Sequence, residues 1–418
     1  MSRKMKDSGV EWIGEIPEEF DIREVKNIFN IGRGRVIAKT EIEPLNNGSL
    51  FPVYSSQTVN NGCMGYIHTY DYEQDGLTWT TDGANAGTVF LRTGKFNCTN
   101  VCGILTTKDK NTCYLPYFAY SVNLSAINSR RSDILGHKVM SNEMAHFKVT
   151  YPTNYNEQIQ IANFLDRKCT AIDTAIEKTK KSIEKLEEYK KAVITKAVTK
   201  GIDPNVKMKD SGEEWIGEIP EGWKVTKTKY LFRILKRIAG REGFDVISIT
   251  QKGLKIKDIT SNEGQVAENY SNYQFVFPGD FAMNHMDLLT GWVDLSALTG
   301  VTSPDYRVFH KIKESVNDDY YKYVFQSLYF NKVYYGLAQG VAEVGRKRLQ
   351  APAFKELKLP CPPLDEPAKI VAYIKDKCMT IDALIEKKQT AINKWEEYKK
   401  SLIYYAVTGK IDCRNEAI

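Results

Sequence analysis

The sequence predicts an α+β protein in which two mixed α/β domains are separated by two long helices that pair as an antiparallel coiled coil. Three observations support this prediction: the chain repeats itself once, two charged segments carry apolar residues at heptad spacing, and the blocks between them are rich in short β-branched and aromatic runs. A length of 418 residues also suits two domains better than one core. We therefore expect a molecule with an internal pseudo-twofold repeat.

The repeat consists of matched segments at the two ends of each block. The stretch MKDSGVEWIGEIPE begins at Met5, and MKDSGEEWIGEIPE begins at Met208. At the other end of each block, EQIQIANFLDRKCTAIDTAIEK begins at Glu157, and its counterpart EPAKIVAYIKDKCMTIDALIEK begins at Glu366. One frame is therefore duplicated, and it holds two blocks of unlike sequence.

The duplication divides the chain into four predicted segments. Residues 1–152 form the first domain with the N-terminal motif, and residues 153–203 form the first spacer helix. Residues 204–362 form the second domain with the repeated motif, and residues 363–418 form the second spacer helix with a C-terminal tail. In each motif copy we expect the single tryptophan to anchor an irregular segment in the core.

Both long segments carry a heptad seam. Between Leu165 and Ala197 the seam positions alternate in steps of four and three, and no Gly or Pro interrupts the segment. An apolar stripe must be buried, and the other copy offers an equally long partner, so we expect the two helices to pair with each other. The predicted seam and partner interface consists of Leu165, Ile172, Ile176, Ile183, Leu186, Ile381, Ile385, Ile392, Trp395 and Leu402.

Four residues interrupt the apolar seam, namely Thr179, Lys190, Lys388 and Lys399. They are either polar positions that set the register of the helix pair or places where a partner protein covers the stripe. Local fraying of the helix ends is a third explanation.

The two blocks between the helices read as mixed α/β heads. They contain short runs, such as those that begin at Leu50 and Phe244, with frequent Gly and Asn between them, which is typical of strands and turns. Aromatic-rich segments around Tyr117 and Tyr320 occupy corresponding places in the two blocks. We expect these segments to be helices whose aromatic side chains lie in the core.

Basic residues gather in loop-like contexts in both heads. Glycine beside arginine permits close approach of the backbone to phosphate, and arginine can bridge a guanine edge with two hydrogen bonds. An isolated basic pair is more often a solvated surface, but the clusters at 130–131 and 346–348 occur at similar depths in the two heads. The candidate DNA-binding residues are Arg33, Arg35, Arg130, Arg131, Lys138, Arg237, Arg241, Arg346, Lys347 and Arg348.

Charge and composition favour a polyanionic partner without demanding one. Lys and Arg number 58 against 52 Asp and Glu, which gives a net charge of +6. The eight cysteines lack the paired spacing of a zinc site or a redox motif, so we predict reduced thiols and no metal site. No stretch approaches the roughly 18 apolar residues of a membrane span, and we expect a cytoplasmic protein.

Motifs of three catalytic classes are missing from the sequence. An adenine methyltransferase needs Asn or Asp before Pro-Pro-aromatic, whereas the Pro-Pro pair at 362–363 follows Cys361 and precedes Leu364. The nearest string to a phosphate-binding loop, Gly87–Lys95, has the wrong spacing, and the histidines lack HExxH spacing. The chain is therefore predicted not to be an enzyme.

The order of block and helix, the DSGxEWIGEIP openings and the Leu-Pro-Cys-Pro-Pro-Leu junction at 359–364 resemble the specificity subunits of type I restriction and modification enzymes, over essentially the whole chain. The resemblance implies that each head is a target recognition domain that reads one half of a bipartite sequence in double-stranded DNA. It also implies that the helices form the spacer to which two methyltransferase (modification) subunits bind, while restriction and translocase subunits join through the complex. S-adenosylmethionine, ATP and Mg would be bound by those partners, and no cofactor by this chain.

Two other functions stay open from the residues alone. One is a coiled-coil scaffold whose two heads bind protein partners, and the other is an enzyme of a type that the motifs do not reveal. Sequence-specific DNA binding that survives competitor DNA at physiological salt separates the specificity subunit from the scaffold. Activity of the chain by itself would favour the enzyme.

Overall fold

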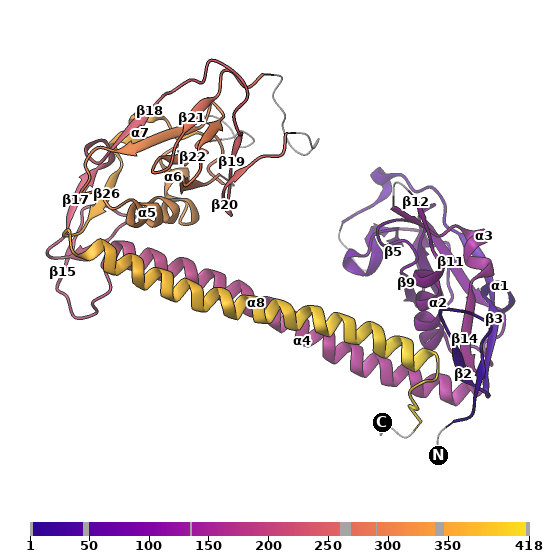
Figure 1. Cartoon of the computed structure of the whole chain (residues 1–418). Coiled ribbons are helices and arrows are strands. Elements are labelled where there is room, and N and C mark those ends of the chain that lie inside the picture. Colours follow the sequence, from indigo (N-terminus) through magenta and orange to yellow (C-terminus); the bar gives the residue numbers. More distant parts are fainter. Residues whose placement is uncertain are drawn as a thin grey trace. The chain divides into compact units, whose positions relative to one another are not determined.

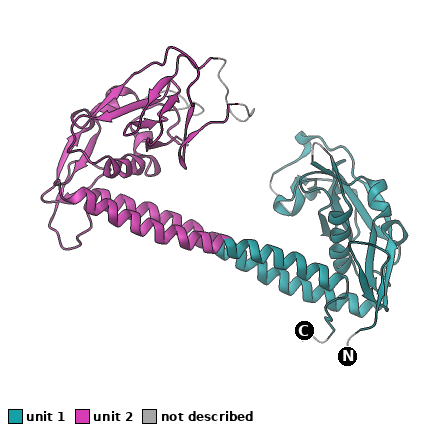
Figure 2. Cartoon of the chain, in the orientation of Figure 1, with its two compact units in different colours: residues 1–179, 390–418 teal, residues 180–389 magenta. Residues whose placement is uncertain are grey.

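The computed structural model describes residues 3–44, 50–133, 136–259, 269–289, 291–338 and 347–414 (Figure 1). The chain divides into two compact units, which are residues 1–179 with 390–418, and residues 180–389 (Figure 2). Both boundaries fall inside the long helices, so each unit contains one head and the adjoining halves of the two helices. The units thus differ from the four predicted segments, because each head packs together with the helix ends beside it.

The two long helices are α4 (Tyr155–Lys200) and α8 (Glu366–Val407), and they pair as an antiparallel coiled coil, as predicted (Figure 1). In unit 1, Lys399 of α8 donates to both carboxylate oxygens of Asp173 in α4 at 2.7 Å. In unit 2, Lys190 of α4 donates to both carboxylate oxygens of Asp382 in α8, also at 2.7 Å. The two pairs occupy equivalent positions of the repeat, so two of the four polar interruptions of the seam are interhelical ion pairs.

Burial along the helix pair follows the predicted seam with one exception. Trp395 is 41% exposed, although it occupies a seam position of the heptad pattern. Its neighbour in the pattern, Ile392, is 2% exposed. The half-buried seam residues are Ile183, Leu186 and Ile385, and the buried ones are Leu165, Ile172, Ile176, Ile381, Ile392 and Leu402.

The first head has an antiparallel central sheet with the strand order β4-β11-β7-β9, and α2 packs against β9, β7 and the nearby β14. Strands β7 and β11 are almost entirely buried and read as near-continuous apolar and small residues. Further sheets have the orders β1-β2, β14-β3, β10-β5-β6 and β12-β13-β8. The elements are β1 (Met5–Asp7), β2 (Glu15–Pro17), β3 (Phe20–Glu24), α1 (Val25–Ile28), β4 (Phe29–Arg33), β5 (Phe51–Tyr54), β6 (Cys63–Ile67), β7 (Gly76–Thr80), β8 (Asp82–Gly83), β9 (Val89–Arg92), β10 (Asn97–Cys98), β11 (Cys102–Thr107), α2 (Leu115–Ser129), β12 (Arg131–Asp133), β13 (Gly136–Lys138), α3 (Ser141–His146) and β14 (Lys148–Pro152).

The second head repeats this plan with different residues. Its central antiparallel sheet has the order β18-β25-β22-β23, and α5 packs against β23. The pairs β15-β16, β17-β26, β19-β20 and β21-β24 complete it. The elements are β15 (Met208–Asp210), β16 (Glu218–Pro220), β17 (Lys224–Lys227), β18 (Phe232–Leu235), β19 (Ile247–Thr250), β20 (Gly253–Ile256), β21 (Gln274–Val276), β22 (Phe281–Met283), β23 (Val293–Leu295), β24 (Gly300–Thr302), β25 (Arg307–Lys311), α5 (Asp318–Phe330), α6 (Val333–Gly336), α7 (Ala351–Glu356) and β26 (Lys358–Cys361).

Each head is fastened to the end of one long helix by a buried tyrosine. The Tyr117 hydroxyl of α2 donates to the carbonyl of Val407 at 3.1 Å, near the end of α8. The Tyr320 hydroxyl of α5 donates to the carbonyl of Val198 at 2.8 Å, near the end of α4. Both tyrosines are fully buried, as expected of core aromatic residues, and each satisfies a carbonyl in the last turns of a helix.

The Tyr320→Phe variant is expected to lower the free energy of unfolding by about 1–2 kcal/mol, because the Val198 carbonyl loses its buried donor. Urea unfolding of the full chain measures this loss. Tyr323→Phe on the same helix is the control, since the half-buried Tyr323 packs against the core through its ring. An equal loss in both variants would show that the Tyr320 hydrogen bond contributes nothing.

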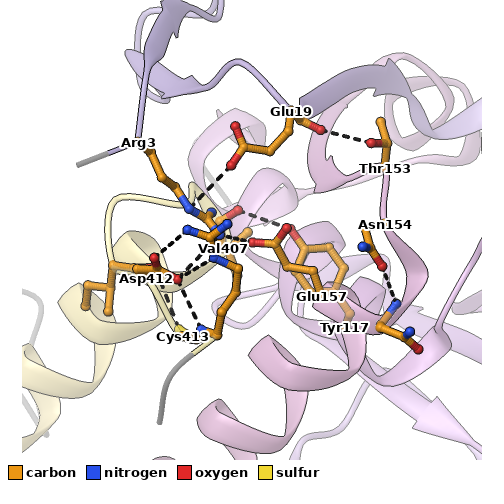
Figure 3. A network of polar contacts seen from close by, with 12 residues as sticks. Arg3, Glu19, Tyr117, Thr153, Asn154, Glu157, Val407, Asp412 and Cys413 are labelled. Carbon is orange, nitrogen blue, oxygen red and sulfur yellow. Dashed lines mark hydrogen bonds and ion pairs between the residues drawn. The ribbon is translucent and has the colours of Figure 1, made fainter. Parts of the chain in front are cut away.

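A polar network holds the first and last described residues together in unit 1 (Figure 3). The Arg3 side chain is 7% exposed, is paired with the carboxylate of Glu157, and lies 3.4 Å from Glu19 and 3.5 Å from Asp412. In the other copy of the frame, the covalent chain through residues 201–207 makes the corresponding connection. In unit 1, ion pairs thus hold together the two parts of the frame that a continuous backbone joins in unit 2.

Candidate nucleic-acid interface

In the first head, predicted basic residues emerge at one edge of the central sheet. Arg33 ends β4 and lies opposite Gly103 in β11, while Cys102 lies opposite Thr80, the last residue of β7. The Arg33 Nε donates to the carbonyl of Asn100. The Thr81 hydroxyl donates to the next carbonyl, that of Val101, at 2.9 Å. Arg33 and the loop that follows β7 therefore meet at the start of β11.

Arg130, Arg131 and Lys138 surround the same loop. Arg130 donates from Nη1 to the carbonyl of Ala86 at 3.0 Å. Arg131 and Lys138 lie opposite each other in β12 and β13, and Lys138 lies opposite Asp82 in β8. The Arg131 side chain is 59% exposed and lies 3.6 Å from the carboxylate of Glu143. Four predicted basic residues from distant parts of the sequence thus gather on one side of the first head.

Arg35 is held by a carboxylate. Its Nε donates to Asp71 at 3.0 Å and 3.1 Å, although the side chain is still 44% exposed. Its backbone forms a parallel bridge with Thr99. The structure therefore gives Arg35 a role in joining two loops at the same edge.

In the second head, the predicted basic residues have different surroundings. Arg237 is paired with the buried carboxylate of Asp280 and lies over the Phe277 ring at 4.7 Å. The exposed Arg241 lies over the Phe244 ring at 5.3 Å. Both guanidiniums are thus in contact with groups of their own head.

The third basic cluster is only partly described, because Arg346 lies outside the described residues. Lys347 is half-buried and lies 4.2 Å from the centre of the Tyr335 ring. Arg348 is exposed and lines a cavity of about 310 Å³ at the edge where β18 and β22 end and β25 begins. Three further lining residues of this cavity carry a basic side chain, namely Lys236, His285 and Arg307.

The two heads repeat two basic positions at this edge. Lys138 directly precedes the fully buried Val139, which lies two residues before the start of α3. In the same way, Arg348 directly precedes the fully buried Leu349, which lies two residues before the start of α7. In the first head, the carbonyl of Val139 accepts from the Trp79 indole at 2.9 Å. In the second head, the carbonyl of Leu349 accepts from an Arg307 Nη at 2.8 Å. Lys138 and Arg348 are therefore equivalent positions of one fold.

The second repeated position follows from strand register. Arg33 of β4 lies opposite Gly103 of β11. Gly103 pairs on its other side with Trp79 of β7, and in the second head Arg307 of β25 pairs with Met283 of β22 at the same step of the sheet. Gly103 and Arg307 are therefore equivalent positions. Continuing the pairing of β18 with β25 places Lys236 opposite Arg307. Sequence reasoning missed Lys236 because a lone lysine beside Arg237 carries no local signal, and only the strand register singles it out.

The pairing of the clusters at 130–131 and 346–348 is also corrected by the structure. Sequence depth alone set Arg130-Arg131 against the later cluster, whereas the fold sets Lys138 against Arg348. The difference arises because Arg130 and Arg131 lie at the end of α2 and the start of β12, whereas Lys138 ends β13, the strand that pairs with β12. Depth along the chain does not distinguish these two strands.

The equivalent positions Gly103 and Arg307 carry different types of residue, a glycine in the first head and an arginine in the second. A Cβ on Gly103 would lie 2.1 Å from the Trp79 ring, so the first head fills this place with an indole and requires glycine beneath it. The second head has Arg307 there, 5% exposed, with its guanidinium 4.7 Å from the Phe354 ring and 4.0 Å from the Met283 sulfur. Burial lowers the pKa of Arg307 to about 10, so the guanidinium stays charged at neutral pH.

Features of two other kinds of site are missing from the described residues. In that part of the chain, no three or more His, Cys, Asp and Glu side chains are grouped so that they could hold a metal ion. Within the same residues, none of the helices is both long and apolar enough to span a membrane.

Comparison with known proteins gives a consistent result. Residues 17–188 match the family described as the type I restriction modification DNA specificity domain. A putative type I specificity subunit N-terminus of Mycoplasma pneumoniae is 44% identical over 142 residues, which are 34% of this chain and 74% of that protein. Two further M. pneumoniae specificity subunits, 39% and 48% identical, are matched over only 34% and 23% of their lengths.

Several matches extend over nearly the whole chain, among them one relative and one solved structure. The MjaVIII type I restriction enzyme specificity subunit of Methanocaldococcus jannaschii is 25% identical over 96% of this chain and 95% of its own. A solved structure from a study of type I restriction-modification complex assembly and conformational transition has a TM-score of 0.66 with 10% identity. It covers 95% of this chain and 99% of the other, and at this identity it shows a shared fold.

Proposed function

The chain belongs to the family of DNA specificity subunits of type I restriction-modification systems, and from this premise we propose that it reads a bipartite DNA target with its two heads and docks methyltransferase subunits through its repeated frame. The single observation that carries the proposal is the repetition of basic positions. Arg33 with Lys138 in one head, and Lys236 with Arg348 in the other, stand at equivalent places of one fold. Equivalent cations on two heads of unlike sequence suit one kind of polyanion that carries two different sequences.

The repeated frame supports docking of the same partner twice. The sequence Glu-Glu-Tyr-Lys-Lys occurs in both long helices, and its tyrosines, Tyr189 and Tyr398, are 57% and 51% exposed. In unit 2, Tyr189 lines a cavity of about 410 Å³ together with Val193, Gly201 and Met208. Exposed aromatic residues beside a cavity are typical of protein interfaces. Because the frame is alike in both copies while the heads differ, two copies of one methyltransferase subunit are the expected occupants.

Catalysis is assigned to the partners. In this proposal, the methyltransferase subunits bind S-adenosylmethionine, and restriction and translocase subunits that join through the complex use ATP and Mg. This chain determines which DNA sequence the complex binds, holds no cofactor of its own and acts in the cytoplasm.

The deciding experiment is co-expression of the chain with its methyltransferase, followed by genome-wide mapping of methylated adenines. We expect a split motif with an unread gap, because each head reads one half of the target. Exchange of the second head for that of a relative is expected to change one half of the motif and to leave the other half unchanged. A continuous motif, or a motif that survives removal of this chain, would contradict the proposal.

A further inference from the structure

The cavity at the edge of the second head brings basic side chains together from four segments. Lys236 follows β18, His285 follows β22, Arg307 begins β25, and Arg348 precedes α7. The amide of Leu349 donates to the carbonyl of His285 at 3.1 Å, which fixes the segment that carries Arg348 against the end of β22. Among the described residues that line the cavity, Asp305 is the one that is acidic.

In the part of the chain that the structure describes, the charges of this cavity have no matching set of carboxylates. The Arg307 guanidinium is buried, and its described hydrogen-bond partners are the Leu349 carbonyl and the Met283 sulfur. The described partner of the Lys236 Nζ is the Pro304 carbonyl, at 2.6 Å. Burial and then the charges of Arg307, Arg348 and Lys236 lower the pKa of His285 to about 4, so His285 is neutral at pH 7. Of the side chains that the structure describes here, three cations therefore face a single carboxylate, and together they give the cavity a positive field.

We propose that this cavity binds one phosphodiester group of the DNA backbone, with Lys236 and Arg348 at its exposed rim and Arg307 beneath them. The inference rests on the proposed function, and it assigns the cavity to the part of DNA binding that does not depend on sequence. A buried cation without a carboxylate partner is costly unless an anion completes it, and Arg and Lys are the usual phosphate ligands.

Phosphate fits this site better than a base edge. Arg307 is 5% exposed and one of its nitrogens is committed to the Leu349 carbonyl, so its guanidinium cannot extend into a groove. Lys236 is likewise tethered to the Pro304 carbonyl beside the cavity. Side chains that converge on one small volume suit a compact anion, whereas readout of bases requires side chains that project from the surface.

The test compares charge-removing variants of the full-length chain, co-purified with the methyltransferase used for mapping. Fluorescence anisotropy measures affinity for two duplexes, one with the mapped target and one with the same bases shuffled, between 50 and 200 mM salt. The double variant Lys236→Gln and Arg348→Gln is expected to bind both duplexes roughly fivefold more weakly at about 0.15 M salt. The slope of log affinity against log salt is expected to become shallower by about 1.

Lys313→Gln is the matched control. Lys313 is an exposed lysine that follows β25, at the end of the β18·β25 pair opposite to Lys236, so K313Q removes one lysine charge, as Lys236→Gln does, from the other end of the same strands. Its affinity and salt dependence are expected to equal those of the unmodified chain. An equal effect of K313Q would overturn the inference, because it would show a general charge effect.

Two other outcomes overturn the assignment. If the double variant weakens binding to the mapped target alone, the cavity reads a base. If neither duplex is affected, the cavity does not contact DNA, while the proposed function stands. Failure of the unmodified chain to bind any duplex would overturn the proposed function together with this inference.

A second readout separates an occupied cavity from a merely structural one. Selective labelling of the five histidines allows the His285 imidazole to be titrated by NMR, with His285→Gln to assign its signal. Bound phosphate offsets the three cations, so the pKa of His285 is expected to rise from about 4 when the duplex is added. An unchanged pKa in the presence of saturating duplex would contradict the assignment.

Discussion

The Ile392→Asp variant is expected to lower the free energy of unfolding by about 3–5 kcal/mol, because it places an unpaired carboxylate in the buried seam of the helix pair. Ile392 is 2% exposed and lies in the half of α8 that belongs to unit 1. Loss of the seam is also expected to weaken association with the methyltransferase, since the proposed docking surface lies on the paired helices. Thermal unfolding and co-purification of the full chain measure the two effects.

Trp395→Asp is the matched control for the seam. It introduces the same charge three residues later on the same helix, at a position that the heptad pattern also assigns to the seam. Trp395 is 41% exposed and its ring contacts that of Tyr398, with centroids 6.3 Å apart. We expect a loss of about 1 kcal/mol or less, as is usual for surface substitutions. Equal losses in the two variants would mean that burial of the seam positions does not govern the stability of the helix pair.

Arg3→Ala is expected to cost about 3 kcal/mol, because it leaves the carboxylate of Glu157 buried without its cation. Arg3 and Glu157 are each 7% exposed, and Arg3 also lies over the Phe20 ring at 5.6 Å. The ion pair connects the N-terminal motif to the start of α4, so we expect unit 1 to lose its stability first. Hydrogen exchange of β1 and of the first turns of α4 locates the loss.

Arg414→Ala is the control for this network. Arg414 donates to the same aspartate as Arg3, since its Nη2 lies 2.6 Å from Asp412, but its side chain is 43% exposed. Exposed ion pairs contribute about 0–1 kcal/mol, so the variant is expected to resemble the unmodified chain. A loss comparable to that of Arg3→Ala would show that the exposed Arg414–Asp412 pair contributes as much to the free energy of unfolding as the buried Arg3–Glu157 pair.

The two heads show how one fold accommodates different surfaces. Both central sheets have the same strand order, yet Trp79 with Gly103 in one head is replaced by Met283 with Arg307 in the other. Both solutions supply a donor to the same carbonyl, that of Val139 or Leu349. The first head thus has a packed indole at this place, and the second head has a charged guanidinium beside a cavity, while the strand order and pairing are the same in both. Variation of this kind suits a head whose framework stays constant while its target changes.

Much of the architecture was predictable because it is written in patterns that run along the chain. The duplicated motif at Met5 and Met208 predicts two copies of one frame, and the heptads of the charged segments predict the paired helices α4 and α8. Such patterns depend on spacing alone, since a helix presents the same face every three to four residues. The identity of the family could likewise be inferred from the order of these segments.

The proposed DNA-binding surface depends on residues that only strand pairing brings together. Lys236, His285, Arg307 and Arg348 are separated by up to 112 residues, and the register of β18, β25 and β22 places them around one cavity. The same holds for Arg35 and Arg237, which the sequence analysis named as candidate DNA-binding residues and which the fold pairs with Asp71 and Asp280. Heptad spacing also could not reveal that Trp395 is exposed. Local periodicity determines which helices and strands form. The electrostatic environment and the burial of any one side chain depend on neighbours that are distant in the sequence, and only the tertiary structure brings those neighbours together.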